Sequence, residues 1–384
     1  MQAALPEAFG LYIHWPFCQA KCPYCDFNSH VSRNIDQKRW LAAYVAEISR
    51  VGAQTTGRTL NSVFFGGGTP SLMEPETVDG IMTAVRATWP TANSIEVTLE
   101  ANPTSVEAGR FQGYRQAGVN RVSMGIQALH DDDLRALGRL HSVAEGLAAF
   151  ETARGIFDRV SFDLIYARQG QTLADWRTEL RRALDLGLDH LSLYQLTIEE
   201  GTAFGDRYAL GKLRGLPDED LSADMYEATQ EICGAAGLMA YEVSNHAKNG
   251  NESQHNLIYW RYQDYAGIGP GAHGRLTLDG QKFATETVLS PGGWLSAVEK
   301  NATGESLRAM LSDEDQFSER LLMGLRLSEG VDLAGSDSAQ NPAFVSNINV
   351  LSDLGLVSYD NLTLLATPKG RPVLNGILRS LLGG

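Results

Sequence analysis

The sequence predicts an α/β fold, a partial TIM-like (β/α)6 barrel followed by a C-terminal helical, winged-helix-like domain. Short apolar runs alternate with amphipathic helical stretches from Leu11 to about Leu196, and several of these runs end directly in polar or glycine-rich sequence. The periodicity changes from Pro217 onward. The predicted organisation is a barrel over residues 1–216, a barrel-flanking segment over 217–310 and the C-terminal domain over 311–384.

The barrel prediction depends on six strand candidates, because apolar runs that alternate with helices call for parallel strands joined by helical crossovers. The expected strands are Leu11–His14, Ser62–Phe65, Ile95–Leu99, Arg121–Gly125, Val160–Ile165 and His190–Leu196. The helices expected between them are Trp40–Val51, Pro75–Thr88, Ser105–Ala117, Val143–Arg154 and Leu173–Leu186. Six units favour an incomplete barrel, although an open doubly wound sheet has the same pattern.

The second half of the chain follows a different pattern. A helix is expected over Glu219–Ala235, then a polar segment from Asn245 to Asn256, and then a turn-rich stretch with little regular structure from Ala266 to Gly274. After Leu311, the sequence predicts helices over Glu314–Leu327 and Phe344–Leu354, a short hairpin, and a last helix over Lys369–Leu382. Helices followed by a small β-ribbon are typical of a winged-helix module.

Composition narrows the class of protein. The 384 residues carry a formal net charge of -14, which opposes binding to nucleic acid because phosphates would have to meet a basic face. No apolar run approaches the length of a membrane span, so we expect no stable membrane insertion. The segment Met1–Glu7 has no basic start followed by an apolar stretch, so we expect no signal peptide and a cytoplasmic location.

Three of the four cysteines lie in one short run, Cys18, Cys22 and Cys25, with the spacing C-x3-C-x2-C. Three thiolates on one loop can each hold one iron of a cubane cluster and leave the fourth iron open. Zinc is the rival ligand, but structural zinc sites draw further ligands from a second knuckle. A disulfide is disfavoured, because an odd cluster cannot pair. The remaining cysteine, Cys233, stands alone in a helical pattern and is interpreted as a small buried hydrophobe.

A glycine motif closes the second predicted strand, Gly66-Gly67-Gly68-Thr69-Pro70. Taken alone it is weak evidence, because tight turns use glycine for structural reasons. Combined with the cysteine loop after the preceding strand, it resembles the radical S-adenosylmethionine (SAM) superfamily. This resemblance implies a [4Fe-4S] cluster on the three cysteines, with the amino and carboxylate groups of exchangeable SAM on the open iron.

The chain resembles one branch of this superfamily in particular, and this resemblance extends over essentially the whole chain. The run from Leu11 to Cys18 is similar to the start of the coproporphyrinogen III oxidase-like branch, which divides into oxygen-independent oxidases and the haem chaperone family HemW. The oxidases carry a further cysteine where this chain has Phe27, and they have a longer segment before the cysteines. The segment His255–Trp260 matches the HNxxYW motif associated with haem in the chaperones. All three features favour the chaperone family.

By resemblance, the cofactor contacts transfer residue by residue to one set of positions. The implied SAM contacts are Tyr12, Tyr24, Gly67, Gly68, Thr69, Glu100, Gln127, Arg139 and Asp163, with Gln195 and Ile268 as weaker candidates. Glu100 and Asp163 suit ribose hydroxyls or an ammonium group, and Arg139 suits a carboxylate. After Asp163 the chain has Ala167-Arg168-Gln169 where the family usually shows Gly-Leu-Pro, which puts the local turn in doubt.

The resemblance also implies the partners. A haem chaperone would bind haem, with His255 as axial ligand and His246 and His273 as fallback ligands, and would pass it to a haem-acceptor protein, for which a respiratory membrane protein is one candidate. The enzymatic alternative is oxygen-independent coproporphyrinogen III oxidase, which decarboxylates propionates by radical chemistry. The sequence therefore leaves open whether the protein is an enzyme, with the chaperone favoured.

Overall fold

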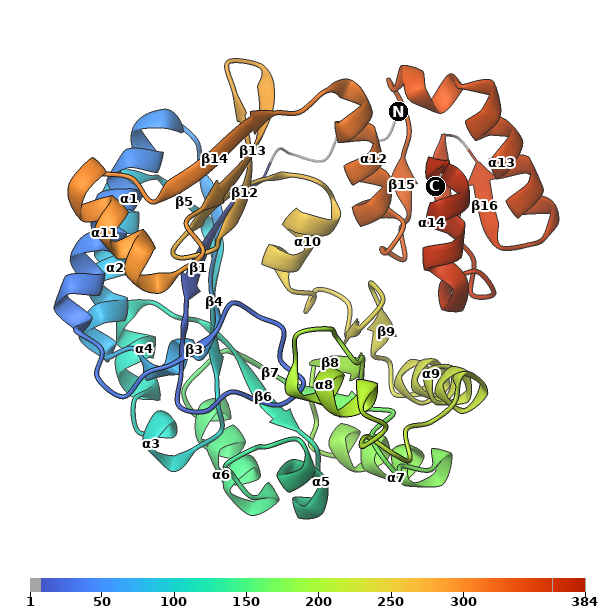
Figure 1. Cartoon of the computed structure of the whole chain (residues 1–384), viewed down its shortest axis with the longest axis horizontal. Helices are drawn as coiled ribbons and strands as arrows, with labels where there is room; N and C mark the ends of the chain where they lie inside the picture. Colours follow the sequence, from blue (N-terminus) through green and yellow to red (C-terminus); the bar gives the residue numbers. More distant parts are fainter. Residues whose placement is uncertain (1–7, 361, 384) are drawn as a thin grey trace.

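A computed structural model describes residues 8–360 and 362–383 of the chain. The expectation about a leader concerns Met1–Glu7, which lie outside the described residues. Most strands belong to one large sheet (Figure 1). Its strands are β1 (Phe9–Trp15), β4 (Leu60–Gly67), β5 (Thr91–Ala101), β6 (Arg121–Gln127), β7 (Arg159–Tyr166), β8 (His190–Gln195), β9 (Met239–Ala240), β10 (Asn245–Ala247), β11 (Asp264–Ile268), β12 (His273–Leu278), β13 (Gln281–Thr287) and β14 (Glu305–Met310).

The strand order distinguishes the two architectures that the sequence left open. Across the sheet the order is β14-β13-β12-β11-β1-β4-β5-β6-β7-β8-β10-β9. The strands β1, β4, β5, β6, β7 and β8 are neighbours in chain order, and each pairs in parallel with the next. A doubly wound sheet reverses direction at a switch point, whereas these strands wind one way. The partial barrel is therefore confirmed, with all six predicted strands present.

Helices cover the outer face of the barrel (Figure 1). They are α1 (Gln37–Gln54), α2 (Pro75–Thr88), α3 (Ser105–Ala108), α4 (Phe111–Ala117), α5 (Asp131–Ala136), α6 (Val143–Arg154) and α7 (Leu173–Leu184). The single helix predicted over Ser105–Ala117 is wrong, because the chain turns at Gly109 between α3 and α4. The turn lets Arg110 donate from Nη1 to the carbonyl oxygens of Ser71, Leu72 and Met73.

Alternation along each strand separates the apolar core from a polar interior. Leu11, Val63 and Leu99 point outward and are fully buried beneath the helices. The intervening residues face the inside of the barrel, where register places Thr98 beside Arg121 and Glu100 beside Ser123. Because the carboxyl ends of parallel strands meet at one rim, these polar side chains converge there.

The segment from Ala266 to Gly274 is more regular than predicted. β11 pairs in parallel with β1, so that Leu11 lies beside Ala266, and the hairpin β12–β13 extends the sheet beyond it. Gly269 and Gly271, which contribute to the turn-rich appearance, lie in the connection from β11 to β12. Gly269 has a φ of 111°, and a Cβ there would collide with the carbonyl oxygen of His14. The prediction of little regular structure is therefore wrong.

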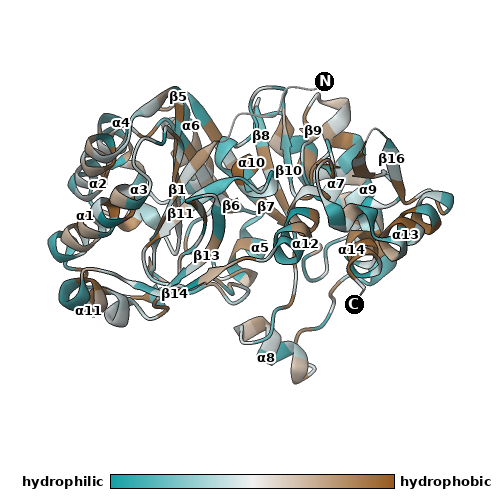
Figure 2. Cartoon of the chain, turned by 90° about the horizontal axis from the view of Figure 1, so that it is seen from above, coloured by the Kyte–Doolittle hydropathy of each residue, from teal (hydrophilic) through white to brown (hydrophobic). Residues whose placement is uncertain are grey.

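The last part of the chain has its own hydrophobic core, which includes Leu321, Leu364 and Ile377. It contains α12 (Asp313–Gly324), α13 (Pro342–Asp353) and α14 (Leu374–Leu382), with a small antiparallel sheet of β15 (Val331–Asp332), β17 (Thr363–Ala366) and β16 (Val357–Asp360). Helices with a β-ribbon match the predicted winged-helix-like arrangement. The hydropathy colouring in Figure 2 shows the apolar character of α14.

The remaining elements connect these parts. They are β2 (Phe17–Cys18), β3 (His30–Val31), η1 (Pro70–Leu72), α8 (Ala203–Ala209), α9 (Glu219–Ala235), α10 (Gln254–Trp260), α11 (Pro291–Asn301), η2 (Asp337–Gln340) and η3 (Arg371–Val373). Seen from above, α8 projects from the body of the molecule (Figure 2). Among the described residues, no helix is both long and apolar enough to cross a membrane.

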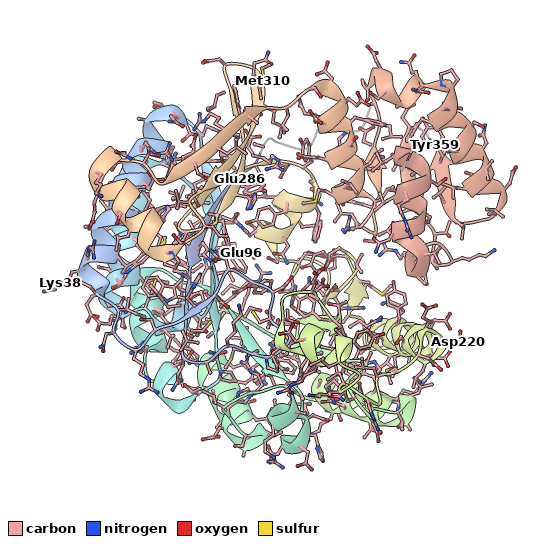
Figure 3. All side chains as sticks on the ribbon, viewed as in Figure 1. Lys38, Glu96, Asp220, Glu286, Met310 and Tyr359 are labelled. Carbon is pink, nitrogen blue, oxygen red and sulfur yellow. The ribbon has the colours of Figure 1, made fainter. Side chains whose placement is uncertain are left out.

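A buried carboxylate ties α10 to the barrel. The Glu96 carboxylate accepts hydrogen bonds from the backbone N–H groups of Gln254 (3.2 Å) and His255 (3.1 Å). It also pairs with Arg159 at 2.6 Å. Arg159 in turn donates to the carbonyl oxygens of Asn251 and Glu252, just before α10. Glu96, labelled in Figure 3, is only 2% exposed, so this connection is internal.

We expect Glu96→Gln to lower the free energy of unfolding at pH 7 by about 3 kcal/mol, because it leaves Arg159 without its buried partner. Burial raises the pKa of Glu96, but Arg121 and Arg159 outweigh it, so the net pKa lies below its usual 4.5. The stabilisation is therefore complete above pH 4.5 and declines as the pH falls through the lowered pKa. Chemical denaturation at pH 7 measures the first effect, and a series continued well below pH 4.5 measures the second.

The matched control is Glu299→Gln, which removes the carboxylate of an exposed pair with Arg39. Exposed ion pairs contribute little to stability, so this variant should unfold like the parent chain. Equal stability of the parent and the Glu96 variant at pH 7 would show that the buried pair does not hold α10.

Candidate functional site

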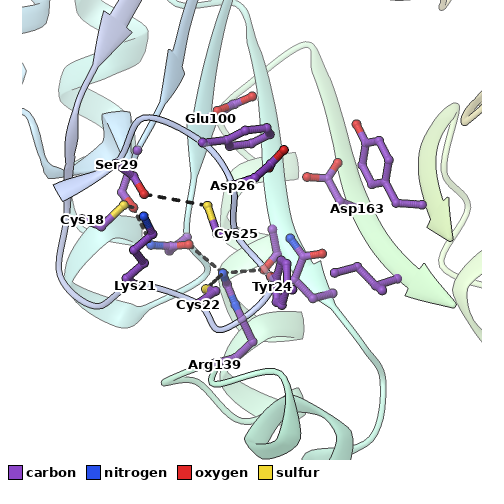
Figure 4. A pocket seen from close by; sticks show the side chains of 18 of the residues that line it. Cys18, Lys21, Cys22, Tyr24, Cys25, Asp26, Ser29, Glu100, Arg139 and Asp163 are labelled. Atoms are coloured by element: carbon purple, nitrogen blue, oxygen red, sulfur yellow. Dashed lines mark hydrogen bonds between the residues drawn. The ribbon is translucent and has the colours of Figure 1, made fainter. Parts of the chain in front are cut away.

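A cavity of ≈ 310 Å³ lies at the carboxyl ends of the barrel strands. This volume is at the lower end of the range of small-molecule sites. Most of the predicted site residues line it, and Figure 4 shows the cysteines facing Arg139, Glu100 and Asp163. The predicted residues in its wall are Cys18, Cys22, Tyr24, Cys25, Gly67, Gly68, Thr69, Glu100, Gln127, Arg139 and Asp163, with the weaker candidate Gln195.

Backbone hydrogen bonds hold the cysteine loop at the rim. β2 and β3 pair in parallel, with Cys18 beside Val31, which brings together the two ends of the loop. Within it, the N–H of Cys25 donates to the carbonyl oxygen of Cys22 at 3.1 Å. From outside, the N–H of Phe204 on α8 donates to the carbonyl oxygen of Pro23 at 2.8 Å. The loop is thus closed on itself and held by a second element.

The fourth cysteine stands apart from this loop. Cys233 lies in α9 and is fully buried, and burial raises the pKa of its thiol to about 12. A thiol that stays protonated in an apolar environment is a poor metal ligand. Its interpretation as a buried hydrophobe is confirmed.

The glycine motif lies directly against the cysteine loop. The N–H of Gly68 donates to the carbonyl oxygen of Trp15 at 2.6 Å, and the N–H of Thr69 donates to that of Phe17 at 2.8 Å. A Cβ on Gly68 would lie 2.7 Å from the backbone oxygen of Phe17, and Gly67 has a φ of 107°. Two backbones can approach this closely only where no side chain intervenes.

Each thiol of the loop has a hydrogen-bond donor beside it. The Thr69 hydroxyl donates to Cys18 Sγ at 3.3 Å, and Arg139 Nη1 donates to Cys22 Sγ at 3.3 Å. The Ser29 hydroxyl lies 3.8 Å from Cys25 Sγ. Such donors stabilise a thiolate, which is the form that binds iron, although burial outweighs them and raises the pKa of Cys18 and Cys25 on balance. Among the described residues, no three or more His, Cys, Asp or Glu side chains lie close enough together to hold a single metal ion.

Two carboxylates share the opposite wall of the cavity. Burial, reinforced by the nearby Asp163, raises the pKa of Glu100 to about 8. Burial also raises the pKa of Asp163 to about 6, although hydrogen bonds from Ser192 and Ser123 oppose it. A cationic or hydroxyl-bearing ligand between them would stabilise the two carboxylates in their charged form against the cost of burial. The wall therefore suits a ligand that carries an ammonium group or a ribose.

Gln127 carries an unsatisfied polar atom at the cavity. Its Oε1 is buried and makes no hydrogen bond within the described part of the chain. Its φ of 70° is uncommon for a residue other than glycine. A buried acceptor without a partner costs free energy, so Gln127 Oε1 is suited to accept a hydrogen bond from a ligand in the cavity.

Tyr12 does not line the cavity. Its hydroxyl donates to His14 Nδ1 at 3.0 Å, and His14 Nε2 donates to the carbonyl oxygen of Asn28 at 2.9 Å. Asn28 immediately precedes Ser29 at the end of the cysteine loop. Tyr12 is therefore connected to the cysteine loop through His14, and its direct contact with SAM stays a prediction. Ile268 also lies outside the cavity wall.

His255 is enclosed rather than open. Its Nδ1 lies 2.7 Å from the hydroxyl of Ser62, and its Nε2 lies 2.8 Å from the hydroxyl of Tyr259. The imidazole stacks on the ring of Phe64, with the two ring centroids 5.1 Å apart. Burial lowers the pKa of His255 to about 3. The imidazole is therefore neutral and both nitrogens are occupied. To bind iron it would have to give up one of these hydrogen bonds, so its role as a haem ligand stays a prediction.

The fallback ligands differ from each other in exposure. His246 is buried in β10, whereas the His273 side chain is 60% exposed at the start of β12. Neither lines the cavity.

The turn after β7 forms despite its departure from the family pattern. Ala167 stands where the family usually has glycine, and it adopts a φ of 58°. A left-handed alanine costs about 1 kcal/mol. The next residue, Arg168, is buried and pairs with Glu179 at 2.6 Å and Asp133 at 2.8 Å. These ion pairs hold the turn that glycine would allow without strain.

Sequence reasoning missed several residues of the site. Asn102, Ser29, Ser123 and Tyr194 all line the cavity. Asn102 follows the end of β5, and Ser123 and Tyr194 face inward on β6 and β8. Their position relative to the strand ends was the available signal, since polar residues there point to the rim.

Comparison with known families and proteins agrees with this geometry. Residues 12–183 match the model of the radical SAM superfamily, and residues 311–373 match that of the HemN C-terminal domain. The bovine radical S-adenosyl methionine domain-containing protein 1, mitochondrial, is 37% identical over 97% of this chain and 87% of its own. The heme chaperone HemW of Mycobacterium tuberculosis is 34% identical over 98% of this chain and 95% of its own. HemW of Escherichia coli is 42% identical over 74% of this chain and 75% of its own.

One solved structure shares the whole fold. Coproporphyrinogen III oxidase (HemN) of Escherichia coli, described as a radical SAM enzyme, superposes with a TM-score of 0.81 over 99% of this chain and 91% of its own. The sequences are only 22% identical, so this similarity shows the fold alone.

We expect replacement of Cys18, Cys22 or Cys25 by alanine to abolish the visible absorbance of a reconstituted iron–sulfur cluster, because each of these thiols lines the cavity. Cys233→Ala is the matched control and should keep the full absorbance and iron content. Loss of the cluster in the Cys233 variant alone would overturn the three-thiolate assignment.

Proposed function

We propose that this chain, which belongs to the radical SAM superfamily and to its branch that includes HemW and radical S-adenosyl methionine domain-containing protein 1, is a haem chaperone. The protein would bind haem and pass it to an acceptor protein. The observation that carries this proposal is the similarity to relatives named heme chaperone HemW over nearly the full length of both chains. Phe27, which is 61% exposed in the cavity wall, stands where the oxidases have their further cysteine, and supports the same assignment.

The cavity residues fit a [4Fe-4S] cluster with exchangeable SAM. Cys18, Cys22 and Cys25 would hold the cluster, whose open iron supplies a position for the SAM amino and carboxylate groups. Glu100 and Asp163 would receive the ammonium group or the ribose hydroxyls of SAM. Gln127 Oε1 supplies an acceptor that is otherwise unpaired. Gly67 and Gly68 line the same cavity, so no side chain at these positions would stand between the backbone and the ligand.

The oxidase alternative rests on the same cavity. A cluster and SAM are also the requirements of radical decarboxylation, so the site by itself does not distinguish the two functions. The distinguishing property is what the loaded protein does with each tetrapyrrole. We also propose a cytoplasmic location, because thiolates that hold a cluster need a reducing compartment.

We expect the cluster-loaded protein to bind haem and to release it to an apo-haem protein, with no conversion of coproporphyrinogen III in the presence of SAM and reductant. The measurements are a haem titration by absorbance, transfer to an apo-haem acceptor, and product analysis after incubation with coproporphyrinogen III. Robust formation of protoporphyrinogen IX would replace the chaperone assignment with the oxidase.

The second test concerns His255. His255→Ala should weaken haem binding and alter the Soret band, because an imidazole ligand bonds iron directly. Ser62→Ala should strengthen haem binding, because it removes the hydroxyl that occupies Nδ1 in the closed arrangement. Cluster content, measured in both variants, shows whether the barrel persists.

If both variants bound haem like the parent chain, with the same spectrum, His255 would not be the ligand. His246 and His273 would then be tested in turn, beginning with the exposed His273.

A further inference from the structure

A continuous hydrogen-bond chain joins two of the three cysteine thiols. It runs through Thr69 and Asn102, which follow β4 and β5, and through Arg139, which lies between α5 and α6. Arg139 Nη1 donates to Cys22 Sγ, and Arg139 Nη2 donates to Asn102 Oδ1 at 2.6 Å. Asn102 Nδ2 then donates to Thr69 Oγ1 at 3.2 Å, and the Thr69 hydroxyl donates to Cys18 Sγ. Every link has one donor and one acceptor, so the direction of the chain is fixed along its whole length.

Asn102 is the central link because it accepts on one side and donates on the other. The hydrogen bond from Arg139 fixes its Oδ1, which leaves Nδ2 to face Thr69. The Thr69 hydroxyl therefore accepts from Asn102 and has its own proton free for Cys18. The backbone N–H of Asn102 donates to Glu107 at 2.9 Å and to Ser71 Oγ at 3.2 Å, which holds the residue in place.

The charge of Arg139 has no carboxylate partner. Within the described residues its guanidinium makes no ion pair within 4.0 Å, whereas Arg159 and Arg168 each pair with a glutamate. It is held instead by the Asn102 amide and, at 2.9 Å, by the carbonyl oxygen of Gly125. An arginine guanidinium is not deprotonated in proteins, so the group is charged. Its Nη1 is directed at Cys22 Sγ, so this positive charge lies against a sulfur of the cysteine loop.

We infer that Asn102, Thr69 and Arg139 form a relay that sets the reduction potential of the cluster by fixing the hydrogen bonds to Cys18 and Cys22. Hydrogen bonds to cluster sulfurs and nearby positive charge stabilise the more negative, reduced cluster. Thr69 and Arg139 act directly on the sulfurs, whereas Asn102 is a positioning residue that touches neither of them. The inference rests on the cluster of the proposed function, although it does not depend on haem transfer.

The test is an EPR-monitored redox titration of reconstituted protein without SAM. Thr69→Val removes the hydroxyl with little change in shape, and Thr69→Ser retains it. Thr69→Val should make the cluster harder to reduce, by about tenfold in the ratio of reduced to oxidised cluster at a fixed potential, or about 59 mV for one electron. Thr69→Ser should titrate like the parent chain.

Asn102→Ala distinguishes a relay from separate contacts. It should shift the potential in the same direction as Thr69→Val, and the double variant should shift it by less than the sum of the two, because both changes act through one chain. Ser29→Ala is the matched control, because Ser29 faces Cys25 outside the relay. Its shift should add to that of Asn102→Ala.

The outcomes separate the relay from a purely structural role. If Asn102→Ala and Thr69→Val carried full clusters with the potential of the parent chain, the inference would be overturned. If Thr69→Val could not be loaded while Thr69→Ser could, the hydroxyl would be needed to hold the cluster, which supports the Thr69–Cys18 bond. Absence of a cluster from the parent chain itself would instead refute the proposed function.

Discussion

The close approach of two backbones, at Phe17 and Gly68, is the constraint on which the site depends. Hydrogen bonds from Gly68 and Thr69 to the segment before Cys18 fix the cysteine loop against the end of β4. A Cβ at Gly68 would lie 2.7 Å from the oxygen of Phe17, so this contact requires glycine. Because the contact positions Thr69 beside Cys18, it also places the first donor against the first thiol.

The rest of the cavity follows from the one-way order of the barrel strands. Parallel strands bring their carboxyl ends to one rim, and period-two alternation sends Glu100, Ser123 and Asp163 inward together. This polar interior is costly without a ligand, as the raised pKa values of Glu100 and Asp163 and the unpaired Gln127 Oε1 show. The apolar outer face, buried under the helices, supplies the stability that supports such an interior.

The sequence predicted the local features of the fold well, because each strand and helix has its own periodicity. It missed β11, since the glycines of the following turn obscured a short strand whose partner, β1, is distant in sequence. It also missed the break at Gly109, which depends on contacts between Arg110 and another loop.

Prediction of the site shows the same limit. Motif spacing identified Cys18 and Gly68, because each belongs to a short motif whose residues lie close together in the sequence. Asn102 could not be identified as the link between Arg139 and Thr69, because the fold alone brings the ends of β4 and β5 next to the α5–α6 connection. The motif around His255 was visible, but not its closure by Ser62 and Tyr259, which arises from packing of α10 inside the barrel.

The central claim is that three thiolates leave one iron of the cluster open to SAM in this cavity. Electron–nuclear double resonance of the reduced protein, with SAM labelled with ¹⁵N in its amino group or with ¹⁷O in its carboxylate, tests it most directly. The account predicts a hyperfine coupling from each label, because both groups would bind the open iron. A reduced cluster whose spectrum shows neither coupling at saturating SAM would contradict it.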